Sequence, residues 1–178
     1  MRVVLVVPSR TDPAHRSAAG GLARALRRRG HTVLTQPASK RPSAGGLEVF
    51  LRAKRAEVCH VHWFSRGLGW LGRFRPPAGV RLVLTHQGAS VELLQRRTAF
   101  ARLARAAAAV TAVSRAGLRE LRAALPGIRD RTAMVANGFE AGLEVRGRGP
   151  GRYILTVGRL AAYKGTDVLA LAFARLAA

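Results

Sequence analysis

The sequence YILTVGRLAAYKGTDVLALAFARL, residues 153–176, joins a short apolar run to a turn with one arginine and one lysine, and then to a helix-like segment. The run Tyr153–Val157 predicts a buried strand, and the segment after Lys164 predicts an amphipathic helix. A strand that leads through a cationic loop into a helix N-terminus is how α/β proteins hold a diphosphate. The stretch therefore predicts an α/β fold, with Arg159 and Lys164 as candidate diphosphate ligands.

Strand-like and helix-like segments alternate through the rest of the chain. Strands are predicted over Arg2–Val7, His31–Thr35, Val58–His62, Val80–Thr85, Val110–Val113 and Thr132–Val135. Helices are predicted from Leu22 to Gly30 and over Leu47–Arg55, Val91–Ala108 and Ala116–Ala124, the last capped by Ser114, while Ser9–Arg16 reads as loop and Trp63–Pro77 as a loose helix or an ordered loop. This order predicts an α/β, Rossmann-like, mostly parallel sheet with helices on both faces.

Three parts of the chain are expected. Residues 1–144 would form a first Rossmann-like domain, and the glycine- and arginine-rich residues 145–152 would form a linker. Residues 153–178 would supply the first strand and helix of a second, incomplete Rossmann-like domain. A strand at that place has unpaired edges, so we expect it to pack on the first domain, to pair with another chain or to be poorly ordered.

Composition limits the classes of protein that fit. Apolar residues make up 48% of the 178 residues, which argues against general disorder. The net charge of +22 comes almost entirely from arginine. Three interpretations compete, namely a codon bias toward arginine, docking on anionic lipid, and nucleic-acid binding. The scattered arginines, with no interleaved aromatic patch, disfavour nucleic acid as a partner.

The only cysteine, Cys59, excludes an internal disulfide and fits a reducing cytoplasm. The apolar start of the chain reads as a strand rather than as a signal peptide, and no run is long enough to span a membrane. The predicted location is cytoplasmic, with peripheral contact at the inner face of the membrane.

Parallel sheets bind ligands beyond the carboxyl ends of their strands. That rule selects five strand-end segments, namely Pro8-Ser9-Arg10, His62-Trp63, His86-Gln87-Gly88, Ser114 and Asn137-Gly138. The candidate cleft residues among them are Ser9, Arg10, His62, His86, Gly88, Ser114, Asn137 and Gly138. His15 and Arg16, in the expected first loop, are further candidates for contact with an acceptor. His60 and His62 alternate along a strand and are expected to face opposite sides, which would make them a poor metal pair. No metal site is predicted.

Six segments in order resemble glycosyltransferase family 4, the retaining enzymes of the GT-B fold. They are LARALRRRGHTV, CHVHWF, LTHQGAS, VTAVSRAGLREL, MVANGFE and VGRLAAYKGTDVLALAFARL. The chain departs from the family at three points. Its paired glycines stand directly before Leu22, Ala136 replaces a proline, and the acidic motif that follows later in the family is absent.

The resemblance implies transfer of a hexose from a nucleotide-diphosphate sugar to a hydroxyl acceptor, lipid-linked or a cell-envelope glycan. Arg159 and Lys164 would bind the donor diphosphate, so that no metal and no other cofactor is needed, and His86 would face the transferred sugar. Two alternatives stay open. The chain could be a catalytically incomplete remnant, or half of a split enzyme whose partner chain completes the donor domain. It could instead be a basic nucleic-acid-binding module.

Overall fold

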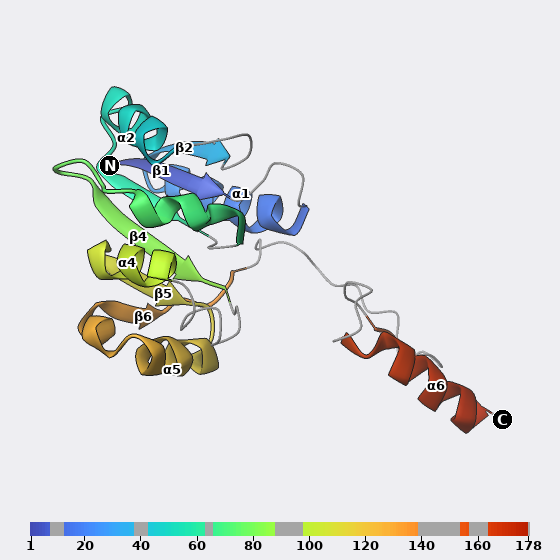
Figure 1. Ribbon diagram of the computed structural model, residues 1–178. Helices are drawn as coiled ribbons and strands as arrows, with labels where there is room; N and C mark the ends of the chain where they lie inside the picture. The colour runs from blue at the N-terminus through green and yellow to red at the C-terminus, as the bar shows by residue number, and fades with distance from the viewer. Residues whose placement is uncertain are drawn as a thin grey trace. The chain divides into compact units, whose positions relative to one another are not determined.

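The computed structural model describes residues 1–7, 13–37, 43–62, 66–87, 98–138, 154–156 and 164–177. The chain divides into two compact units, Met1–Ala141 and Gly142–Ala178. The first unit contains a sheet covered by helices, and the second contains one described helix (Figure 1).

A six-stranded parallel sheet, in the order β2-β1-β3-β4-β5-β6, forms the first unit. Its strands are β1 (Arg2–Val7), β2 (Thr32–Pro37), β3 (Val58–Val61), β4 (Arg81–His86), β5 (Ala109–Ala112) and β6 (Thr132–Met134). The central strands are almost continuous apolar runs, because a parallel sheet is buried on both faces. The predicted α/β, Rossmann-like parallel sheet is confirmed, and each of the six strands lies within two residues of its predicted bounds.

Helices connect the strands and cover both faces of the sheet. They are α1 (Pro13–Arg28), α2 (Ala44–Ala53), the 3₁₀ helix η1 (Arg66–Arg73), α4 (Thr98–Ala106), α5 (Arg115–Ala124) and the 3₁₀ helix η2 (Pro126–Arg131). Neighbouring residues of a strand face opposite sides. On β1, Val3 and Leu5 therefore pack with α1, while Val4 and Val6 belong to the core shared with the other helices.

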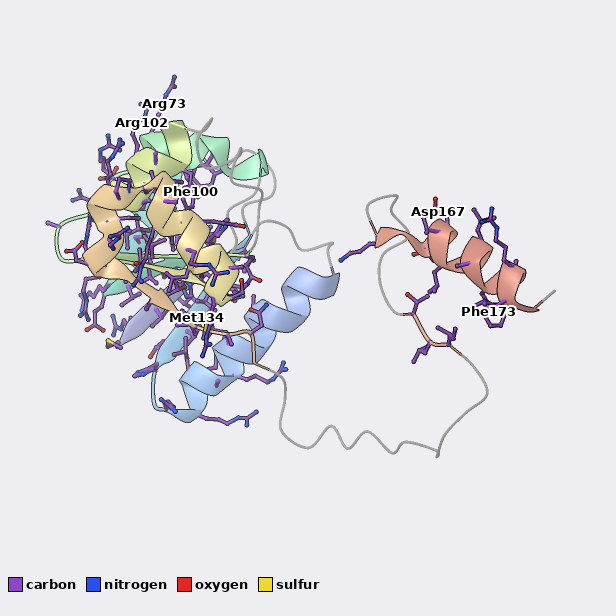
Figure 2. The ribbon with its side chains drawn as sticks, turned by 90° about the horizontal axis from the view of Figure 1, so that it is seen from below. Arg73, Phe100, Arg102, Met134, Asp167 and Phe173 are labelled. Carbon is purple, nitrogen blue, oxygen red and sulfur yellow. The ribbon has the colours of Figure 1, made fainter. Side chains whose placement is uncertain are left out.

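The core on the face of the sheet opposite α1 includes Phe100, which is 2% exposed. Phe100 lies among buried side chains of η1, α4 and α5. Arg73 and Arg102 project outward from the same helical layer (Figure 2). In these helices apolar side chains thus point inward while Arg73 and Arg102 point outward, as an amphipathic covering layer requires.

Two helices begin three or more residues before their predicted first residue. Helix α1 begins at Pro13, so His15 and Arg16 lie in a helix and not in a loop. Proline suits the first turn of a helix because its missing N–H would have no intrahelical partner there. Helix α2 begins three residues earlier than predicted, because Ser43 caps it by accepting a hydrogen bond from Gly46 N at 2.9 Å. Of the helix predicted over Val91–Ala108, residues 91–97 lie outside the described residues.

The second unit contains helix α6 (Thr166–Ala177). Its described residues 154–156 are not in a strand, and Ile154 and Leu155 are 61% and 73% exposed. The prediction of a buried strand is therefore wrong for these three residues. A strand needs a neighbour to pair its N–H and C=O groups, and none is present among the described residues of this unit. Figure 2 shows Phe173 on α6, which is half exposed.

Among the helices that the structure describes, none combines the length and the apolar character needed to cross a bilayer.

Candidate functional site

Three polar side chains meet at the edge of the sheet where the strands end. His62 follows β3, Gln87 follows β4, and Asn137 comes three residues after β6. Gln87 Nε2 lies 3.2 Å from His62 Nε2, and Asn137 Nδ2 donates to Gln87 Oε1 at 3.3 Å. We call these three residues the strand-end row. It links the ends of three strands at the edge where parallel sheets bind ligands.

Gln87 belongs to the strand-end segment His86-Gln87-Gly88 that the sequence rule selects, although no role of its own was predicted for it. The structure thus joins His62 and Asn137 through Gln87, which the same rule selects. The available signal was its place directly after a strand.

His86 lies apart from the strand-end row, on the other face of the sheet. It is the last residue of β4, is 3% exposed, and its ring centroid lies 6.2 Å from that of Phe100. A Cβ added at Gly117 would lie 3.8 Å from His86 Cδ2, so the first turn of α5 also packs on the imidazole. His86 Nε2 is buried, and among the described residues it has no hydrogen-bond partner.

Burial lowers the pKa of His86, against an opposing effect of the Glu120 carboxylate, which raises it. The imidazole is therefore held neutral at pH 7. A neutral imidazole can donate or accept a hydrogen bond, but it does not offer a positive charge to a ligand.

Ser114 caps helix α5, as the sequence predicts. Its Oγ accepts a hydrogen bond from Gly117 N at 3.0 Å, with extended backbone angles at Ser114. This contact satisfies one of the N–H groups that a helix leaves unpaired at its start. The hydroxyl oxygen of Ser114 is thereby engaged in the fold at the same edge of the sheet.

A second polar row crosses the sheet one step below the strand ends. His60 Nε2 lies 2.7 Å from Thr85 Oγ1, which lies 2.9 Å from Thr111 Oγ1, and Thr111 donates to Leu84 O at 3.3 Å. Burial, with a smaller effect of His62, lowers the pKa of His60 from 6.5 to about 4. His60 is thus a neutral part of the fold at pH 7.

The prediction that His60 and His62 face opposite sides is wrong. Residues two apart in a strand share a face, and the two rings lie 5.5 Å apart in an edge-to-face arrangement. No group of three or more His, Cys, Asp or Glu side chains suited to a metal occurs within the described residues. Cys59 is buried, which raises the pKa of its thiol to about 12 and leaves it protonated.

The pKa of His60 predicts a pH-dependent stability. The unfolded chain binds a proton at His60 near pH 6.5 and the folded chain only near pH 4, so the unfolded state holds more protons between these values. The contribution of His60 to the free energy of unfolding is therefore complete above pH 6.5. It falls by about 3 kcal/mol as the pH drops toward 4. Urea unfolding of the wild type and of His60→Gln at pH 7 and pH 4 measures this. Equal losses in the two proteins would contradict it.

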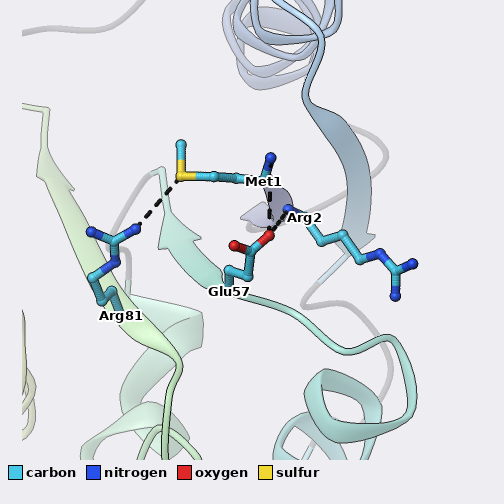
Figure 3. Close-up of polar contacts among 4 residues, drawn as sticks. All are labelled: Met1, Arg2, Glu57 and Arg81. Atoms are coloured by element: carbon cyan, nitrogen blue, oxygen red, sulfur yellow. Dashed lines mark hydrogen bonds and ion pairs between the residues drawn. The ribbon is translucent and has the colours of Figure 1, made fainter.

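At the opposite edge of the sheet, where the strands begin, backbone and side-chain groups of neighbouring strands contact one another (Figure 3). Glu57 Oε2 accepts a hydrogen bond from Arg2 N at 2.6 Å and lies 3.9 Å from the amino group of Met1. Arg81 Nη2 reaches Met1 Sδ at 3.5 Å. These contacts tie the beginnings of three strands together and include none of the predicted site residues.

The remaining candidates are placed as follows. Lys164 is exposed and lies just before α6 in the second unit, and Gly138 is exposed beside Asn137. His15 and Arg16 belong to α1. Four candidates lie outside the described residues: Ser9, Arg10, Gly88 and Arg159.

Comparison with known proteins gives structural matches only. No protein-family model and no curated protein matches the chain. It is similar to an alpha-glucosyltransferase in complex with UDP and a 13-mer DNA containing a HMU base, with a TM-score of 0.56, 11% identity, and coverage of 78% of this chain and 43% of the other. It is also similar to an alpha-glucosyltransferase in complex with UDP and a 13-mer DNA containing a central A:G mismatch. That match has a TM-score of 0.51 and 12% identity, and it covers 75% of this chain and 40% of the other.

The chain thus spans about two fifths of the length of these glucosyltransferases. At this identity the likeness establishes a shared fold, a Rossmann-like parallel α/β sheet, and selects no family.

Proposed function

We propose that the chain is the acceptor-side domain of a retaining glycosyltransferase of the family 4 type, together with the first part of its donor-binding domain. The reaction would move a hexose from a nucleotide-diphosphate sugar to a hydroxyl acceptor. The observation that carries this proposal is the strand-end row, a set of hydrogen-bonded polar side chains at the ligand-binding edge. The sheet that presents it has a fold like that of a UDP-bound glucosyltransferase.

The chemistry of the row suits a sugar. The two amides offer directional donors and acceptors without a formal charge, and the imidazole nitrogens offer further hydrogen-bonding positions. A hexose presents several hydroxyl groups, each of which both donates and accepts. Asn137 is exposed and would meet such hydroxyls first, because Gln87 is only partly exposed and His62 is buried.

Arg159 and Lys164 would bind the diphosphate and stabilise the charge that develops as the nucleoside diphosphate leaves. In this proposal the two cations take the part that a metal ion plays in other transferases. His86, held neutral by burial, would act through a hydrogen bond from Nε2 once the donor is bound, and not as a nucleophile. The net charge of +22 fits an acceptor presented at an anionic membrane.

Incubation of the full chain with UDP-glucose and a panel of hydroxyl acceptors tests the proposal. UDP is the nucleotide bound in the similar structures, so UDP-glucose is the natural first probe. We expect UDP release and a glucoside whose anomeric configuration is that of the donor. Saturable binding without turnover would support the alternative of an incomplete remnant or half of a split enzyme. An inverted product, or no binding at all, would contradict the proposal.

A further inference from the structure

We propose that Gln87 is a positioning residue that fixes the tautomer of His62 and the orientation of the Asn137 amide. The role of Gln87 in ligand binding rests on the proposed glycosyltransferase site. The tautomer assignment is independent of that function, because it follows from hydrogen bonds inside the first unit.

The direction of the hydrogen bonds follows from the amide of Gln87. Asn137 Nδ2 is a donor, and it lies 3.3 Å from Gln87 Oε1, so this end of the Gln87 amide is the acceptor. The other end, Nε2, can only donate, and it lies 3.2 Å from His62 Nε2. His62 Nε2 must therefore accept, which leaves the imidazole uncharged with its one proton on Nδ1.

His60 takes the opposite tautomer by the same kind of argument. Thr111 gives its single hydroxyl proton to Leu84 O, so it accepts from Thr85. Thr85 has then used its own proton, and its Oγ1 must accept from His60 at 2.7 Å. His60 therefore carries its proton on Nε2. Two histidines two residues apart are assigned different tautomers by different neighbours.

This arrangement determines what the strand-end row offers a ligand. With Asn137 Nδ2 turned toward Gln87, the carbonyl oxygen Oδ1 is left as an acceptor on an exposed side chain. Gln87 also joins the ends of β3, β4 and β6 across the intervening β5. A hydroxyl-bearing ligand would thus meet an acceptor whose position is set by Gln87 before the ligand arrives, which lowers the cost of ordering the site on binding.

Nitrogen-15 NMR of the histidine side chains in the full-length chain at pH 7 tests the assignment. We expect His62 to show an unprotonated Nε2 and His60 a protonated Nε2, with signals identified through His62→Asn and His60→Gln. In Gln87→Glu, both carboxylate oxygens accept, so the proton of His62 should move to Nε2. Gln36→Glu, the same change on edge strand β2, should leave both tautomers as they are.

A second variant covers the case in which Gln87→Glu does not fold. Asn137→Ala removes the donor that orients the Gln87 amide, and it should turn the single tautomer of His62 into a mixture. A wild-type His62 protonated on Nε2, or a tautomer that neither variant changes, would overturn the assignment. This readout needs no ligand, so a failure of UDP-glucose to bind would count against the proposed function alone.

Discussion

Replacement of Phe100 by alanine is expected to lower the free energy of unfolding of the first unit by about 3–5 kcal/mol. Phe100 is 2% exposed and lies in the core shared by η1, α4 and α5. Its ring also lies against the imidazole of His86. The substitution removes a large buried side chain and leaves a cavity that close-packed neighbours fill only in part. Urea unfolding followed by circular dichroism measures the loss.

Phe173→Ala is the matched control, because it deletes the same atoms from a side chain that is 51% exposed on α6. It should leave the unfolding midpoint of the first unit unchanged. A loss below about 1 kcal/mol for Phe100→Ala would show that α4 does not cover the sheet as described, since exposed sites give changes of that size.

Alanine at Lys164 or at Arg159 is expected to weaken the binding of UDP-glucose by about 10- to 100-fold for each change, the range for a lost hydrogen bond to a charged group. Each cation would contact the diphosphate and neither would contact the base. Binding of uridine, which lacks phosphate, should therefore not change. Isothermal titration with both ligands measures the difference.

Arg175→Ala is the control for charge alone, because Arg175 lies in the last turn of α6 and far along the helix from Lys164. It should weaken UDP-glucose binding only slightly. Equal weakening by Arg175→Ala and Lys164→Ala would indicate a general attraction between a basic chain and an anion, and would remove the diphosphate assignment.

Most of the first unit could be predicted from the sequence because its strands are short apolar runs between polar or glycine-containing turns. Arg2–Val7 is such a run, and it forms β1 with the predicted bounds. The same signal failed at residues 154–156. An apolar run reports a tendency to be buried, and it does not report whether neighbouring strands are present to pair with it.

The candidate site was less predictable than the fold. The strand-end rule placed His62 and Asn137 at the correct edge, but register decides which side chains of neighbouring strands share a face. Residues 60 and 62 share one face, whereas Thr85 and His86 point to opposite faces, and this separates His62 from His86. The contact of Gln87 with two other strands depends on the order β3-β4-β5-β6 and on side-chain conformation. No pattern of residues along the chain encodes the strand order or the side-chain conformation.

The central claim is that the carboxyl edge of the sheet binds a nucleotide sugar, and backbone NMR of the full chain during titration with UDP-glucose tests it most directly. We predict saturable shifts at the amides of Gln87, Asn137 and Gly138, with none at Arg2, Glu57 and Arg81 on the opposite edge. Shifts confined to the opposite edge, or no saturable shift at millimolar ligand, would contradict the account.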